Sequence, residues 1–215
     1  MSGCSGLMKP TVGILAYGSL IANPGAEIEC ATVETKEGIT TPFNVEFARS
    51  SNERHGAPTL VPVTGHSAPV RARVFVLNVS EVEATDRLYR REINKVGSAR
   101  RYRVPKNPGP NTVIVKRLEK FEGIDVVLYT EIAANIQNLT AETLATHAIK
   151  SARAQDDGRD GISYLIDAKN YGVETPMSAA YEEEIKKQTQ ASDLQEALRK
   201  VRGSALRPPV VLERE

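Results

Sequence analysis

The chain has 215 residues, of which 40% are hydrophobic and 26% are charged, and its formal net charge is +1. This length suits one sizeable domain that buries a core without cross-links. The near-neutral charge argues against a dedicated nucleic-acid binder, which usually carries a strong basic excess. Cys4 and Cys30 are too few for a zinc cage or a secreted disulfide framework. With no visible signal peptide or membrane span, we expect a cytoplasmic protein without a membrane partner.

The first half of the chain has the pattern of strands. Residues 11–16 are a short apolar run typical of a buried strand, which ends at a turn signal beginning with Tyr17. Phe43, Val45 and Phe47 alternate with polar residues, which predicts a half-buried strand. Further strands are predicted at residues 59–63, 70–79, 101–104, 112–118 and 124–130.

One helix is predicted inside this strand-rich half. Ser80 and Glu83 have the spacing of a capping box, so a helix should begin there and run to about Glu92. We expect Val82, Leu88 and Tyr89 to face inward.

After residue 139 the apolar residues recur with a helical period. Four helices are expected: the first is capped by Thr140 and runs through Arg153, and the second starts at Ile162 and stops at Gly172. The third has Pro176 in its first turn. The fourth begins with Ser192 and Gln195 at capping-box spacing and ends at Gly203. In the third, Ala180, Tyr181 and Ile185 should share one side.

Strands first and helices last favour an α+β fold over a doubly wound sheet. The close spacing of the strands suggests a closed or nearly closed small mixed barrel with surrounding helices. We divide the sequence into a tail at residues 1–10, a domain at 11–190, and a C-terminal helix with an extended tail at 191–215, which contains Pro208 and Pro209.

The turn Tyr17-Gly18-Ser19-Leu20 is the first candidate for chemistry. Successive main-chain N–H groups in such a turn bind a carboxylate or a developing oxyanion, and the alternative is a plain strand-to-loop turn. A nucleophilic role for Ser19 would need a histidine base, and the sequence places none beside it. The three histidines, His55, His66 and His147, lack metal-site spacing.

Glu92 is the carboxylate that stands out. It lies four residues after Leu88 and therefore on or next to the apolar face of the predicted helix. A carboxylate in such a place has either an ion-pair partner or a functional reason. The partners that the sequence offers are Arg87, Arg91 and Lys95.

The order and spacing of several segments resemble the gamma-glutamylcyclotransferase-like proteins. The matching segments are the strand and loop at 14–20, the blocks 43–50 and 56–60, the strand and helix end at 74–77 and 88–92, the strands at 101–104 and 126–129, and the helical segment 164–173 with Tyr181. The likeness spans about residues 12–188. Two departures are Tyr89, where the family often has aspartate, and a loop after Glu92 that is rich in arginine and lysine.

The resemblance implies an enzyme of the acyltransferase or lyase type, which closes a gamma-glutamyl group into 5-oxoproline without cofactor or metal. It also implies that Glu92 is the general acid and base. Tyr17, Gly18, Ser19 and Leu20 would cradle the substrate, and Tyr129 would line the pocket or be a core aromatic. The implied partner is a small gamma-glutamyl molecule, as in glutathione metabolism, with no nucleic acid and with a homodimer as the candidate assembly.

Two alternatives stay open beside this enzyme. One is a non-catalytic ligand-binding or regulatory member of the same fold, and the other is a related amide-forming or deblocking enzyme. The stretch 93–118 contains seven basic residues and no Asp or Glu. It would select an acidic substrate, contact phosphates, or form a solvated face.

Overall fold

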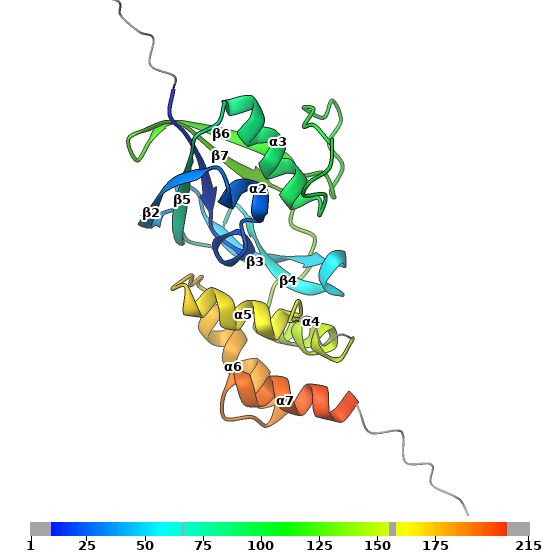
Figure 1. Cartoon of the computed structure of the whole chain (residues 1–215). Helices are drawn as coiled ribbons and strands as arrows, with labels where there is room; N and C mark the ends of the chain where they lie inside the picture. Colours follow the sequence, from blue (N-terminus) through cyan, green and yellow to red (C-terminus); the bar gives the residue numbers. More distant parts are fainter. Residues whose placement is uncertain (1–9, 66, 155–157, 206–215) are drawn as a thin grey trace, which may run out of the picture. The chain divides into compact units, whose positions relative to one another are not determined.

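The computed structural model describes residues 10–65, 67–154 and 158–205, and the chain divides into two compact units. The first unit combines the N-terminal part up to Thr41 with Arg71–Ile132, and the second combines Pro42–Val70 with the chain from Ala133 onward. Strands dominate the first unit and helices dominate the second (Figure 1). The α+β class is confirmed, while the sequence division at residues 10 and 190 stays a prediction.

The first unit is built on a five-stranded mixed sheet. In spatial order its strands are β2 (Thr32–Thr40), β5 (Arg71–Leu77), β1 (Val12–Ala16), β7 (Ile124–Glu131) and β6 (Ile114–Phe121). β1 pairs with β7 in parallel and with β5 antiparallel, so it is the central strand. All five of its residues are buried, as its apolar sequence predicts.

The described part of this unit contains three helices: α1 (Ser19–Ala22), α2 (Ala26–Glu29) and α3 (Glu81–Glu92). α3 packs against β7 and β1 through Ala84 and Leu88, both fully buried. Its predicted start is confirmed, because the Glu83 N–H donates to Ser80 Oγ at 3.3 Å. The inward placement of Val82 is wrong, since this side chain is 73% exposed.

A second stripe on α3 explains that error. Asp86 and Arg90 follow Val82 at helical spacing and are both buried, because the loop at residues 93–113 contacts the helix at these two positions. Val82 lies one turn before Asp86, and no described contact of the loop reaches it.

The predicted strand at residues 101–104 is wrong, because residues 93–113 form an irregular loop. The Tyr102 N–H donates to Asp86 Oδ1 at 2.7 Å, and the Tyr102 hydroxyl accepts from the Val115 N–H at 3.1 Å. Side-chain contacts thus satisfy groups that a strand would have paired in a ladder. The sequence analysis predicts no strand at β2. This is an edge strand whose residues are mostly exposed, so it shows no apolar alternation.

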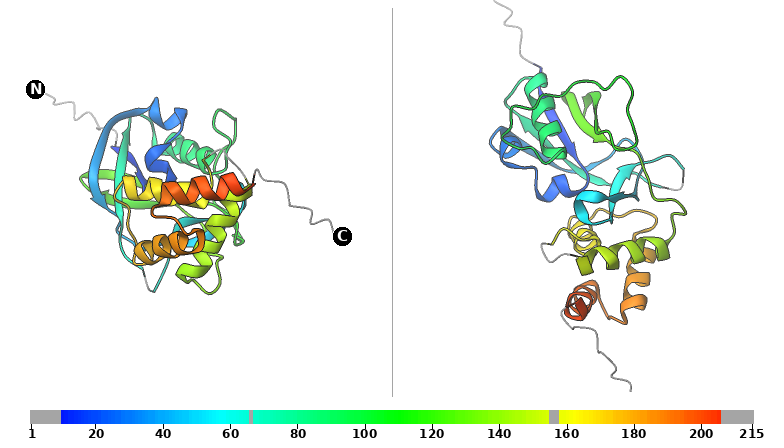
Figure 2. Two further views of the ribbon diagram at one scale, coloured as in Figure 1. Left: turned by 90° about the horizontal axis from the view of Figure 1, so that it is seen from below. Right: turned by 90° about the vertical axis from the view of Figure 1, so that its right-hand side faces the viewer.

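Where the second unit is described, it consists of a hairpin and four α-helices. β3 (Val45–Ser51) and β4 (Ala57–Pro62) pair antiparallel, and the short 3-10 helix Asn52–Arg54 connects them. The helices are α4 (Ala141–Ala154), α5 (Gly161–Asn170), α6 (Ser178–Thr189) and α7 (Leu194–Ala205). α4 and α5 contact β4, whereas α6 and α7 pack against α4, which gives the unit its core (Figure 2).

The buried carboxylate of Glu46 is the main surprise of this unit. Alternation predicted that Glu46 faces solvent, but residues 45–49 are all buried. The carboxylate accepts hydrogen bonds from Thr175 Oγ1 at 2.5 Å, from the Phe47 N–H at 2.8 Å and from the Met177 N–H at 3.3 Å. Glu46 therefore joins β3 to the segment that begins α6. Burial raises the pKa of Glu46, although these hydrogen bonds act in the opposite direction.

The helix signals of the second unit were partly right. The Thr143 N–H donates to Thr140 Oγ1, and Gly172 follows α5 with a φ of 68°, so both of these predictions are confirmed. α6 begins only at Ser178, so Pro176 precedes the helix instead of lying in its first turn. Tyr181 and Ile185 are buried as expected, whereas Ala180 is exposed.

The last helix begins with a different cap from the predicted one. The Glu196 N–H donates to Asp193 Oδ1 at 2.7 Å, and the Glu196 carboxylate accepts from the Ser192 N–H at 2.7 Å. The box is therefore displaced by one residue, and Gln195 has no part in it. Gly203 does not end the helix, which runs to Ala205. Pro208 and Pro209 lie outside the described residues.

Two broader expectations concern the whole described chain. Within residues 10–65, 67–154 and 158–205, no ladder joins β2 to β6 into a closed barrel, so the barrel stays a prediction. None of the helices in these ranges combines the length and the apolar character that a membrane crossing requires.

We predict that Glu46 makes stability depend on pH in the acidic range. Because its folded pKa is raised, its favourable contribution is fully present below the ordinary value of 4.5 and is lost as the pH rises through the folded pKa. Across that window the free energy of unfolding should fall by about 1.4 kcal/mol per pH unit relative to Glu46→Gln. Urea unfolding at a series of pH values measures this difference.

Glu174→Gln is the matched control, because Glu174 is exposed and lies beside the same segment. A wild-type profile parallel to that of Glu46→Gln would show that Glu46 does not titrate in this way.

Candidate functional site

The turn after β1 is held against β7. Tyr17 is buried, and its hydroxyl donates to the main-chain carbonyl of Thr130 at 2.6 Å. The φ of Gly18 is −146°, so the turn does not use the left-handed conformation that glycine adopts most easily. Tyr17 thus fixes the turn through its hydroxyl, and its predicted contact with substrate stays a prediction.

α1 begins directly at this turn. The Ile21 N–H donates to the Gly18 carbonyl at 2.9 Å, and Gly18 gives the helix no side-chain cap. The first N–H groups of a helix have no acceptor within it, so the N–H groups of Ser19 and Leu20 are the donors that this turn offers. The Leu20 side chain itself is buried in the core.

Glu92 ends α3 and forms an ion pair. Its side chain is 23% exposed, and Oε1 lies 2.9 Å from Arg91 Nη1. Of the three partners that the sequence offered, Arg91 is the one observed, while Arg87 pairs with Glu83. The alternative that Glu92 has an ion-pair partner is therefore confirmed for Arg91.

The same arginine reaches the turn after β1. Arg91 Nη2 donates to Ser19 Oγ at 3.1 Å, and Nε and Nη2 both donate to the Asn23 carbonyl at the end of α1, at 3.1 and 2.8 Å. One guanidinium thus joins the Glu92 carboxylate to the Ser19 hydroxyl. A guanidinium donates protons and accepts none, so this contact gives no support to Ser19 as an activated nucleophile.

Tyr129 lies on β7, opposite Lys116 of β6 and next to Thr130, which binds Tyr17. Burial raises the pKa of Tyr129, and the negative charge of Glu131 adds to this effect while Lys116 opposes it. The phenol is therefore neutral at physiological pH. Tyr129 lies on the strand that holds the turn, and its contact with a substrate stays a prediction.

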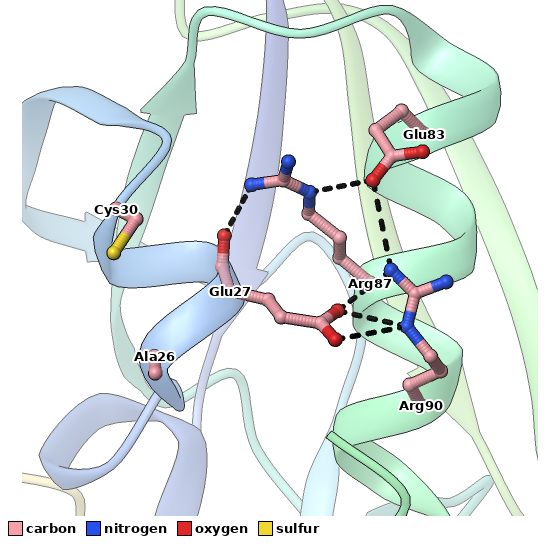
Figure 3. A pocket seen from close by; sticks show the side chains of 6 residues that line it. All are labelled: Ala26, Glu27, Cys30, Glu83, Arg87 and Arg90. Carbon is pink, nitrogen blue, oxygen red and sulfur yellow. Dashed lines mark hydrogen bonds and ion pairs between the residues drawn. The ribbon is translucent and has the colours of Figure 1, made fainter. Parts of the chain in front are cut away.

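A second charged cluster joins α3 to α2. It surrounds an open cavity of about 410 Å³ lined by Ala26, Glu27, Cys30, Glu83, Arg87 and Arg90 (Figure 3). Arg90 Nη2 lies 2.6 Å from a Glu27 carboxylate oxygen, and the Gly97 N–H donates to the same carboxylate at 2.5 Å. Arg87 donates to the Glu27 main-chain carbonyl and to Glu83.

The charges of this cluster hold α3 and α2 together. Burial acts to raise the pKa of Glu27, but hydrogen bonds from Arg90 and Gly97 and the charges of Arg90 and Arg87 outweigh it, so the pKa lies below its ordinary value. Glu83, Arg87 and Arg90 share one face of α3, which the sequence shows. Glu27, which both arginines bind, is about sixty residues away, and no local pattern points to it.

The basic loop after Glu92 is held along α3. Arg90 Nη1 donates to the Arg100 carbonyl at 3.0 Å, and Tyr102 binds Asp86 as described above. Arg101, Arg103 and Lys106 are exposed, which agrees with a solvated face. At the far end of the basic stretch, Lys116 pairs with Glu131, and Arg117 pairs with Glu81.

The remaining candidate ligands form no metal site in the part of the chain that is described. No group of three or more His, Cys, Asp and Glu side chains is placed there to hold a metal ion. His55 is exposed with a φ of 52°, and Cys30 is an exposed free thiol. His66 and Cys4 lie outside the described residues.

No protein-family model and no curated protein matches this chain. The family resemblance therefore rests on the order and spacing of the motifs alone.

We predict that Asp86 determines the order of the loop. Asp86→Ala removes the acceptor of the Tyr102 N–H, and losing a hydrogen bond to a charged group costs about 1.5–3 kcal/mol. Amide hydrogen exchange at residues 100–104 should become faster while exchange in β1 stays unchanged. Asp86→Asn keeps an oxygen acceptor and is the control. Equal protection in the Ala variant and the wild type would contradict this role.

Proposed function

We propose that this protein is a gamma-glutamylcyclotransferase-like enzyme with the barrel-type fold of that family. It would convert a gamma-glutamyl amide or amino acid into 5-oxoproline and a free amine. The observation that carries the proposal is the link through Arg91, which joins the Glu92 carboxylate to Ser19 at the turn after β1. An acid and the side chain of a turn residue that lie 73 residues apart in the chain (92 − 19) are thereby connected through one guanidinium.

The proposed chemistry is an intramolecular acyl transfer. The α-amine of the substrate attacks its own γ-carbonyl carbon, a new C–N bond closes a five-membered lactam, and the original amide C–N bond breaks. Because the nucleophile is tethered to the carbonyl, the enzyme mainly has to hold the near-attack geometry. The reaction needs neither metal nor cofactor.

Glu92 would carry the proton. The α-amine is an ammonium at neutral pH and must lose a proton before it attacks, and the leaving nitrogen must gain one. Glu92 Oε1 is bound to Arg91, while Oε2 has no partner among the described residues. That second oxygen is free to accept the ammonium proton and return it to the leaving group.

The turn would bind the negative charge of the substrate. The N–H groups of Ser19 and Leu20 suit the α-carboxylate or the tetrahedral oxyanion, because donors that are already oriented need no reorganisation during the reaction. Gly18 lets a ligand approach the backbone closely, and the neutral phenol of Tyr129 would line the same site. Tyr17 contributes by holding the turn to β7.

We predict that Glu92→Gln abolishes lactam formation without unfolding the protein. Loss of a general acid and base lowers the rate about 10²–10⁴-fold. Release of 5-oxoproline measures the activity, and circular dichroism with a thermal melt checks the fold. Glu83→Gln on the same helix is the matched control and should keep wild-type turnover. A folded Glu92→Gln variant with near wild-type turnover would remove Glu92 from the mechanism.

The second candidate is a non-catalytic binding module, and the ion pair of Glu92 with Arg91 is the observation that favours it, because a paired carboxylate is a common structural feature. A panel of gamma-glutamyl amines, amino acids and peptides separates the two. We expect at least one member to release 5-oxoproline. Tight binding by calorimetry with no release across the panel would support the binding module instead.

A further inference from the structure

Arg91 uses all three nitrogens of its guanidinium. Nε and Nη2 both donate to the Asn23 carbonyl, Nη2 also donates to Ser19 Oγ, and Nη1 is left for Glu92. The side chain is only 17% exposed. A planar fork held at two of its nitrogens has one orientation, so the direction of Nη1 is fixed by α1.

The aliphatic part of Arg91 is also confined. Gly25 has a φ of 84°, and a β-carbon at this position would lie 3.4 Å from Arg91 Cγ and 3.5 Å from Val96 Cγ2. These are ordinary van der Waals distances, so the arginine stem lies directly beside Gly25, just before the start of α2.

The neighbouring arginines have different tasks. Arg90 binds Glu27 of α2 and the carbonyl of Arg100, whereas Arg91 binds Ser19 and Asn23 of α1. Successive residues on a helix point about 100° apart, so the two side chains leave α3 in different directions. Of these two arginines, Arg91 is the one that contacts both the candidate acid and the candidate binding turn.

We propose that Arg91 is a positioning residue, which orients the Glu92 carboxylate relative to the turn by holding Oε1 and leaving Oε2 available for proton transfer. This rests on the proposed function of Glu92. Lysine is a poor replacement, since a single ammonium cannot hold the Asn23 carbonyl in a fork and present a fixed donor to Glu92. Orientation matters because a misplacement of about 1 Å at a reacting group costs on the order of 10²-fold in rate.

The test compares Arg91→Gln and Arg91→Lys on a gamma-glutamyl amide that the wild-type chain turns over. We expect Arg91→Gln to lower kcat by about 10²-fold with little change in KM, because the carboxylate is misdirected while the main-chain donors remain. Arg91→Lys should restore only part of kcat. Arg87→Gln, one turn earlier on α3 and directed to Glu83, is the matched control and should keep wild-type kcat.

The outcomes separate this inference from the function on which it rests. Wild-type kcat in folded Arg91→Gln, with Glu92→Gln inactive, overturns the positioning role alone. A raised KM with unchanged kcat also overturns it, since it would mean that Arg91 binds the substrate directly. An active Glu92→Gln variant removes Glu92 from the mechanism, and the positioning role with it, whereas a wild-type chain that releases no 5-oxoproline from any gamma-glutamyl compound overturns the proposed function itself. If Arg91→Gln fails to fold, Arg91→Lys decides, because it keeps the stem and the charge and loses the fork.

Discussion

The arrangement of the first unit depends on how α3 is attached to the two short helices beside the sheet. Two consecutive arginines do this. Arg90 binds Glu27 of α2, and Arg91 binds the Asn23 carbonyl at the end of α1. Charged hydrogen bonds of this kind are shorter and stronger than neutral ones, and the guanidinium adds a fixed geometry. The end of α3 is thus attached to both α1 and α2. Arg90 also donates to the Arg100 carbonyl, which attaches the loop after α3 to the same helix.

Two carboxylates of the chain, the partly exposed Glu27 and the buried Glu46, show how partners decide the electrostatics. Glu27 meets two guanidiniums, and its pKa is lowered although burial acts the other way. Glu46 of the second unit meets a hydroxyl and two amide N–H groups, and its pKa is raised by burial. The same type of side chain thus has its pKa lowered where it meets guanidiniums and raised where it is buried among neutral donors. Both join segments that are far apart in the sequence.

The candidate site combines an acid that already has a partner with donors from a turn. On its own, the ion pair of Glu92 would favour a structural carboxylate. The contacts of its partner change this interpretation, because Arg91 also binds Ser19 and so connects the acid to the turn that the motif singles out. An arginine in this place supports both functional candidates, since it orients the acid for chemistry or completes a site for binding. The basic loop that follows extends along α3 as a solvated face.

The sequence by itself determined the features that depend on neighbours within a few residues. These include the buried strand β1, the cap at Ser80, the helix that ends at Glu92 and the glycine after α5. Tertiary structure decided the rest. The burial of Glu46 requires Thr175, and the loss of the expected strand at 101–104 follows from contacts with Asp86 and Val115. A capping residue or an apolar period acts over one or two helical turns, whereas these partners meet only when the chain has folded, so no local pattern contains them.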